Sequence, residues 1–466
     1  MGNRCGGTGR SSCVAVFAGL VIAGLAIPMA AAPASAETDV LFVGNSFTHG
    51  RYPPVLNYNA ADASDPSNAV VHDLLCPGTG TGSCASGVEA TSPVFPTSGN
   101  TPGGTLAAQL NYLNSNPTAQ YTEVGPFGGT AGIFLQLTKD AGLDYNVSLM
   151  AVSSATLKGY LNNTGNEAGD LPLIENSKYQ NVVLQDQSFQ PLPTTINVNG
   201  QPVPTRGNPT NFKSGVNGLI SGIDGADATA GTAKAAITLY ESPPLAEYGY
   251  TSSNPNQPIF GSSTPAAQGG NPAYAPYLGD ANPMAAMASD LHNAYTSAAA
   301  SAAKTYGNTV DVALAGDAWI TAMNSGLAQT DPYLVNEPAG EIDLWDSDPL
   351  LACCTTPVGY HPSVFGDYLD AMSLFYTITG INPLTLQNEF DPVDPNYALS
   401  ASDQLGITPA IAYELAEASV LTQDAGGPVP EPASILVFGF AAVALGGIRA
   451  RRGGILRRRR VVSPRP

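Results

Sequence analysis

The sequence predicts an α/β fold in which a parallel sheet is covered by helices on both faces. Two observations lead to this prediction. Short, largely apolar runs recur along the chain, and segments with apolar residues at helical spacing lie between them. Strands that alternate with helices favour a parallel sheet, because each helix returns the chain to the end of the sheet where the previous strand began. The predicted strands are residues 40–43, 147–152, 181–184, 236–240 and 310–314.

The helical segments between these strands have apolar residues at i, i+3 and i+4. The predicted core helices are residues 133–141, 284–303 and 364–379, and a further helical stretch covers 405–421. Segments rich in Gly, Pro, Ser, Thr and Asn interrupt this alternation, so we expect them to be long surface insertions. These segments lie near residues 62–104, 191–227 and 242–283.

Both ends of the chain differ from this body. Residues 1–36 combine Arg4 and Arg10 with an apolar run and the small residues Ala34-Ser35-Ala36, the pattern of a cleaved signal peptide. Near the other end, Val429-Pro430-Glu431-Pro432 precedes a largely apolar run of sixteen residues and an arginine cluster. A run this short is atypical of a permanent membrane span. Residues 37–427 therefore form the predicted domain, and 428–466 a tail.

The tail resembles the PEP-CTERM sorting signal of Gram-negative bacteria. That resemblance implies export, processing by an exosortase, and delivery to the cell surface or beyond, with membrane contact only through the transient tail. Residues 37–432 hold 8 basic residues against 37 acidic ones, a formal charge near −29. Such a charge disfavours nucleic acid or anionic lipid as a partner.

Four cysteines remain in the predicted mature chain, an even number that suggests disulfides in an exported protein. They are Cys76, Cys84, Cys353 and Cys354. Adjacent Cα atoms lie about 3.8 Å apart, below the usual range for a disulfide. We therefore favour bonds from Cys353 and Cys354 to Cys76 and Cys84, in either connectivity, over a bond between the two neighbours.

Two segments carry residues suited to nucleophilic catalysis. The first predicted strand ends in Gly44-Asn45-Ser46, which places Ser46 at the carboxyl edge of the sheet, where ligands of open α/β sheets bind. The second is Gly359-Tyr360-His361-Pro362-Ser363, which precedes the last core helix. A neutral imidazole at His361 could accept the proton of a serine hydroxyl. A helix cap and a structural loop histidine are the alternatives at these two positions.

Together these segments resemble the SGNH (GDSL-like) hydrolase family, in the subgroup with GNSF in place of GDSL. The stretch VVLQDQS at 182–188 is similar to that subgroup's third-strand segment. The resemblance implies a three-layer flavodoxin-like fold and hydrolysis of acyl esters, with Ser46 as nucleophile and His361 as base. We find no clustered metal ligands and no phosphate-binding glycine loop, so we expect neither a metal nor a cofactor.

The sequence departs from the family pattern in two places. Val358 occupies the position of the usual triad acid, so we expect Asp348, or otherwise Asp346, to act across a cysteine-bearing insertion. The usual glycine and asparagine of the oxyanion hole are also missing. We expect the donors to be the backbone N–H groups of Ser46 and Ser154 and the side chain of Gln185, or otherwise that of Gln187.

Two functions fit these observations. The first is an exported serine esterase, acting on acylated carbohydrate or another ester. The second is a non-catalytic matrix or glycan-binding protein that keeps the fold with a degraded site. Family resemblance does not fix the substrate.

Overall fold

The computed structural model describes residues 37–51, 54–76, 84–85, 124–163, 167, 169–250, 275–333, 340–346 and 360–426. Contacts divide the chain into Met1–Ala36 and Glu37–Pro466, and the described residues belong to the second unit. The expected signal peptide and sorting tail lie outside the described residues. Within the described part, no helix combines the length and apolar character needed to cross a membrane.

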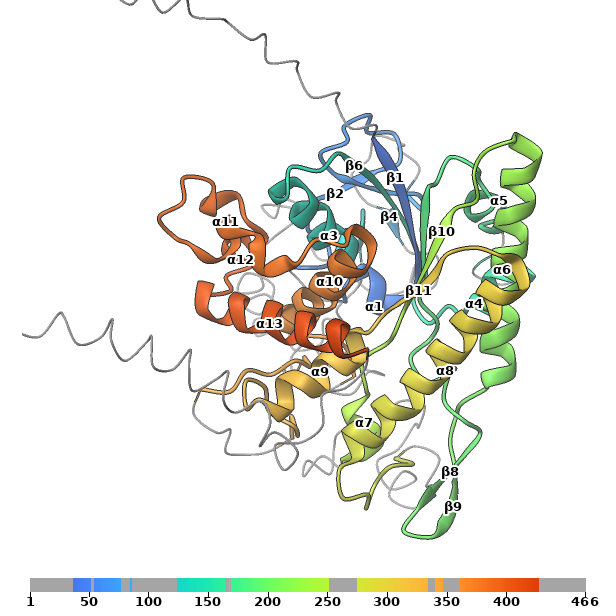
Figure 1. Cartoon of the computed structure of the whole chain (residues 1–466), viewed down its shortest axis with the longest axis vertical. Coiled ribbons are helices and arrows are strands. Elements are labelled where there is room, and N and C mark those ends of the chain that lie inside the picture. Colours follow the sequence, from blue (N-terminus) through green and yellow to red (C-terminus); the bar gives the residue numbers. More distant parts are fainter. Residues whose placement is uncertain are drawn as a thin grey trace, which may run out of the picture. The chain divides into compact units, whose positions relative to one another are not determined.

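A seven-stranded sheet forms the centre of the fold, and every neighbouring pair of strands is parallel (Figure 1). From one edge to the other, the strands are β11 (Val310–Ala313), β10 (Ala236–Tyr240), β7 (Asn181–Leu184), β1 (Thr38–Gly44), β6 (Tyr145–Ala151), β3 (Val71–Asp73) and β2 (Ala60–Asp62). From β1 the chain goes to the edge strand β2 and returns through β3 to β6 beside β1; it then continues on the other side of β1 through β7, β10 and β11, so β1 is the topological switch point. The α/β prediction is confirmed, and all five predicted strands are present.

Side chains of β1 alternate between two cores. Val40 and Phe42 belong to one apolar cluster, while Leu41 and Val43 belong to the other, as the two-residue period of a strand requires. Helices cover both faces (Figure 1). The first cluster lies under α3 (Gly129–Asp140), α9 (Ala315–Asn324), α10 (Val364–Thr379) and α13 (Pro409–Ala425). The second lies under α4 (Leu157–Asn162), α6 (Pro209–Ala230) and α8 (Pro283–Tyr306).

Shorter elements fill the connections. The helices are α1 (Ser46–His49), α5 (Leu171–Ile174), α7 (Ala246–Gly249), η3 (Pro383–Thr385), α11 (Gln387–Phe390), η4 (Tyr397–Leu399) and α12 (Ala401–Gln404). Two small antiparallel pairs are formed by β4 (Cys84–Ala85) with β5 (Val124–Gly125) and β8 (Thr195–Val198) with β9 (Gln201–Pro204).

The segment 191–227 is not the surface insertion expected from its composition. Its first part forms the β8–β9 hairpin, and its second part is most of α6, which buries Phe212, Val216 and Leu219 in the core. Glycines conceal this helical pattern in the sequence. At Gly215, a Cβ would lie 2.7 Å from Leu157 Cβ and Lys158 N, so the missing side chain lets α4 approach closely.

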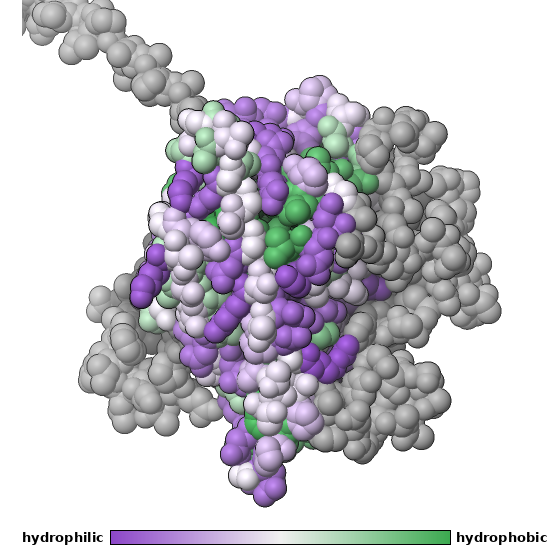
Figure 2. All heavy atoms as spheres, turned by 90° about the vertical axis from the view of Figure 1, so that its right-hand side faces the viewer, coloured by the Kyte–Doolittle hydropathy of each residue, from purple (hydrophilic) through white to green (hydrophobic). Residues whose placement is uncertain are grey.

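Figure 2 shows the face seen from the right of Figure 1, where hydrophilic and neutral residues predominate.

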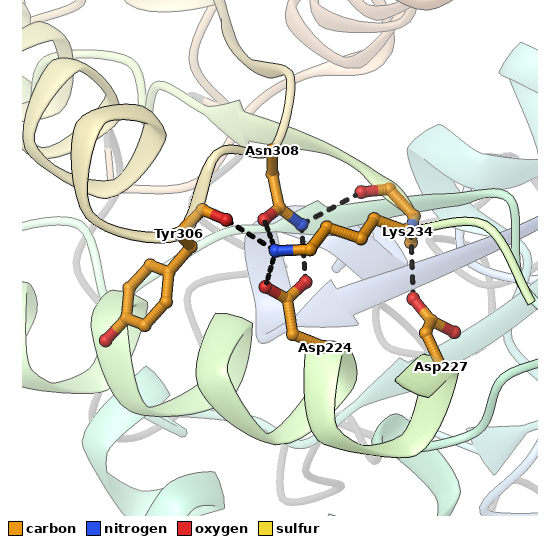
Figure 3. A network of polar contacts seen from close by, with 6 residues as sticks. Asp224, Asp227, Lys234, Tyr306 and Asn308 are labelled. Atoms are coloured by element: carbon orange, nitrogen blue, oxygen red, sulfur yellow. Dashed lines mark hydrogen bonds and ion pairs between the residues drawn. The ribbon is translucent and has the colours of Figure 1, made fainter. Parts of the chain in front are cut away.

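A polar network fixes the amino end of β10, the end opposite to Ser46 (Figure 3). Lys234 Nζ forms an ion pair of 2.6 Å with Asp224 of α6, and Asn308 Nδ2 donates to the same carboxylate at 2.7 Å. Asp227 accepts a hydrogen bond of 3.0 Å from the backbone N–H of Ala235. These contacts join α6, β10 and the turn before β11 far from the candidate site.

Candidate active site

The candidate nucleophile stands on a tight turn between β1 and α1. Asn45 caps α1, because its side-chain oxygen accepts from Phe47 N–H at 3.1 Å while its Nδ2 donates to Ala155 O at 3.2 Å. Gly44 is sterically required, since a Cβ there would lie 1.9 Å from Thr48 Oγ1. Ser46 is the first residue of α1 and is 6% exposed.

The candidate base is held at the entry to α10. Ser363 caps that helix, and its N–H donates to Leu344 O at 2.8 Å. Backbone pairing also fixes His361, whose carbonyl accepts from Asp346 N–H at 2.8 Å. The segment 342–346 therefore lies directly beside the candidate base.

These two elements bring Ser46 and His361 into contact across 315 residues of sequence. His361 Nε2 lies 2.9 Å from Ser46 Oγ, a hydrogen-bond distance at which the imidazole can accept the hydroxyl proton. The rings of Phe47 and Tyr360 pack on His361 at centroid distances of 5.2 and 4.7 Å. Packing on the ring limits its rotation away from the serine.

The surroundings favour a neutral imidazole. Burial lowers the pKa of His361 well below its ordinary value of 6.5, and the positive charge of Arg51 and the neighbouring His49 lower it further. A neutral imidazole is the form that can act as a base.

A narrow cavity of about 20 Å³ opens above the Ser46 hydroxyl, room for one water-sized group. Its lining consists of polar and aromatic side chains from several loops: Asn45, Ser46, Phe47, Arg51, Ser154, Gln187, Ser188, Tyr360 and His361. Sequence reasoning missed Arg51, which is 6% exposed. The scarcity of basic residues could have drawn attention to Arg51, because only 8 remain between the predicted signal peptide and the tail.

The predicted oxyanion donors are only partly brought together. Ser154 lines the cavity and has a φ of +64°, in the left-handed region. Gln185 does not line it, which corrects the expected donor. Its Nε2 donates to Asp186 O and, at 3.0 Å, to Ser242 Oγ, while its Oε1 accepts from Thr48 Oγ1 at 3.0 Å. Gln187, the alternative, does line the cavity.

The position of the third triad member remains a prediction. Asp348 lies outside the described residues, and so do Cys353 and Cys354. Asp346 is described and reaches His361 through the backbone hydrogen bond. Cys76 is buried in the turn that follows β3, whereas the side chain of Cys84 is outside the described part, so the disulfide connectivity also stays a prediction.

Comparisons with known proteins give two distant structural likenesses. No family model matches the chain, and no curated protein matches it. A DUF4886 family protein from Bacteroides uniformis aligns over 85% of this chain and 98% of its own, with 12% identity and a TM-score of 0.41. A protein named provisionally as an SGNH hydrolase, from Slackia heliotrinireducens, aligns over 73% and 99%, with 14% identity and a TM-score of 0.31. Likenesses this distant do not assign an activity.

Proposed function

We propose that this protein is a serine hydrolase that cleaves acyl esters. The observation that supports the proposal best is the 2.9 Å contact between His361 Nε2 and Ser46 Oγ, inside a cavity at the carboxyl end of β1. A serine is a weak nucleophile unless a base takes its proton, and this geometry supplies such a base.

In the proposed reaction, Ser46 Oγ attacks the ester carbonyl while its proton moves to His361 Nε2. Backbone N–H groups of Ser46 and Ser154, with the Gln187 side chain, hold the negative oxygen that forms. His361 then gives the proton to the leaving alcohol, which leaves an acyl-serine. Water attacks that ester with His361 again as base, and free acid and serine are restored. Asp348 is proposed to hold the imidazole in the required orientation.

The test is covalent labelling with a fluorophosphonate, followed by intact-mass measurement of the purified protein. Wild type should gain one adduct, and Ser46→Ala and His361→Ala should gain none. Ser154→Ala is the matched control, because Ser154 also lines the cavity and the substitution keeps the backbone N–H. An unlabelled but folded wild type, or a labelled Ser46→Ala, would refute the assignment.

The finer parts of the proposal concern substrate and location. We propose export by the signal peptide, exosortase processing of the tail, and an O-acylated polysaccharide as substrate. The test is release of acid from an acylated glycan by wild type but not by Ser46→Ala, with removal of residues 1–36 and of the tail checked by mass.

A non-catalytic glycan-binding role is the second candidate. The observation that favours it is the commitment of Gln185 to Asp186 and Ser242, which removes one expected oxyanion donor. This second role would be favoured if the protein binds a glycan, is not labelled by the fluorophosphonate, and binds the glycan equally well as the Ser46→Ala variant.

A further inference from the structure

A second cluster of functional side chains lies at the carboxyl end of β10, apart from the Ser46 cavity. Glu241 follows β10 directly, His292 belongs to α8, and Asp317 lies in the first turn of α9. One potential ligand atom from each residue lies within 4.8 Å of the other two. His292 Nδ1 and Asp317 Oδ2 are 2.6 Å apart.

Both carboxylates are buried, and three of their four oxygens have no hydrogen-bond partner among the described residues. Glu241 and Asp317 are each 0% exposed. Among the described residues, neither oxygen of Glu241 forms a hydrogen bond, and Asp317 Oδ1 forms none. A buried charge without a partner is costly, so such groups usually keep a proton, pair with a cation or bind a metal. Gly316 lets α9 approach this site, since a Cβ there would lie 2.6 Å from Ser242 O.

Among the described residues, no lysine or arginine forms an ion pair with Glu241 or Asp317. In the part of the chain that the structure describes, the ion pair of this cluster is the one between His292 and Asp317. The cluster therefore favours either a shared proton or a cation.

We propose that Glu241, His292 and Asp317 bind one divalent transition-metal ion, with zinc the best fit. Two carboxylates and a neutral imidazole carry a charge of −2, which Zn²⁺ cancels. Oxygen and imidazole nitrogen are accepted zinc ligands, and three protein ligands leave a fourth position for water. The side chain of His292 is 20% exposed, which gives water and the ion a path to the cluster. The ion takes the place of the proton now held between His292 and Asp317.

The proposed role of the ion is structural, because it would join β10, α8 and α9. No residue of the cluster lines the Ser46 cavity. One hydrogen-bonded path between the two places runs through Ser242, whose hydroxyl accepts from Gln185, which in turn accepts from Asn45 N–H at 3.2 Å. This inference does not depend on the proposed esterase activity. It also revises the expectation from sequence that the chain binds no metal.

The experiment is metal titration of the full-length protein after removal of bound metal with a chelator. Isothermal titration calorimetry with Zn²⁺ should give one equivalent bound, with weaker binding of Mn²⁺. Ca²⁺ should not bind, because it needs six to eight oxygen ligands. Glu241→Gln and His292→Gln should each weaken Zn²⁺ binding at least tenfold. Asp224→Asn is the control, since it removes a carboxylate far from the cluster and should leave the titration unchanged.

Two results would overturn the proposal: wild type that takes up no equivalent of zinc or manganese, or a Glu241→Gln variant that binds as wild type does. If the variants do not fold, zinc-edge absorption spectroscopy on wild type decides the question. A spectrum that shows zinc bound by oxygen ligands and one imidazole would support the site. Sulfur ligands would assign the zinc to the cysteines instead and refute it.

Discussion

Replacing Gly44 by alanine tests whether the turn that carries Ser46 depends on the absence of a side chain. The new Cβ would lie 1.9 Å from Thr48 Oγ1 and 2.9 Å from Gln185 Oε1, whereas ordinary contacts begin near 3.4 Å. Thr48 must move, and it then loses its 3.0 Å hydrogen bond to Gln185. Overpacking costs about 1–3 kcal/mol and a lost buried hydrogen bond about 1 kcal/mol, so we expect Gly44→Ala to lower stability by roughly 2–4 kcal/mol.

Urea unfolding at constant pH measures this change as a difference in free energy of unfolding. The matched control is Gly225→Ala in α6, where no atom lies within 4 Å of the added Cβ. The double variant Gly44→Ala/Thr48→Ala removes the Oγ1 collision but keeps a contact of 2.8 Å with Thr48 Cβ. It should therefore be destabilised by less than the sum of the two single variants.

If the free energy of unfolding of Gly44→Ala lies within about 0.5 kcal/mol of the wild-type value, this reasoning is refuted. A change that small is typical of surface substitutions that disturb no packing or hydrogen bond. A second readout is the rate of fluorophosphonate labelling. Since a misplacement of about 1 Å can cost as much as 100-fold in rate, labelling of Ser46 should slow even where the protein stays folded.

Three further predictions concern helix propensity and charge. Gly225→Ala should raise the free energy of unfolding by about 0.5–1 kcal/mol, because alanine favours an exposed helix interior over glycine; urea unfolding would show no gain if the prediction is wrong. Burial raises the pKa of Asp370 from 3.8 to about 7, so the folded state keeps a proton that the unfolded state releases. The contribution of Asp370 to stability should fall as pH rises from about 4 to 7, and Asp370→Asn should flatten the measured dependence; an unchanged slope would contradict the assignment. Arg51→Gln should raise the pKa of His361, since burial and then the charge of Arg51 lower it. An NMR titration of the imidazole measures this shift, and a lower or equal pKa would contradict the prediction.

The central strands could be predicted because they are buried on both faces. Residues 40–43 and 182–184 are continuously apolar, and the structure places them side by side in β1 and β7. The edge strand β2 and its neighbour β3 have only three residues each, one of them His72, and their composition resembles that of a loop. Apolar runs therefore indicate the central strands and the edge strand β11, but not β2 and β3 at the other side of the sheet.

Of the candidate site, the sequence could supply the pair Ser46 and His361, because each stands in a distinct motif and histidine is rare in this chain. The choice between Gln185 and Gln187 could not be made in the same way. β7 ends at Leu184, so the two-residue alternation of side chains no longer applies to the turn that follows. Tertiary contacts with Thr48 and Ser242 decide where Gln185 points.

The cluster at Glu241 could not be predicted for a different reason. Its three residues lie on three elements, separated by long stretches of sequence, so no local spacing connects them. Only the packing of α8 and α9 against the end of β10 brings the ligand atoms together.

The long separation between Ser46 and His361 has a consequence for synthesis of the chain. The serine is among the first residues of the sheet to leave the ribosome, whereas the histidine follows 315 positions later. At a synthesis rate of about 5–20 residues per second, roughly 15 to 60 seconds pass between them. During that time the nascent chain carries the hydroxyl without its base. A fragment that ends before His361 should therefore be chemically inert, and the proposed reaction can begin only once the last part of the core has been added.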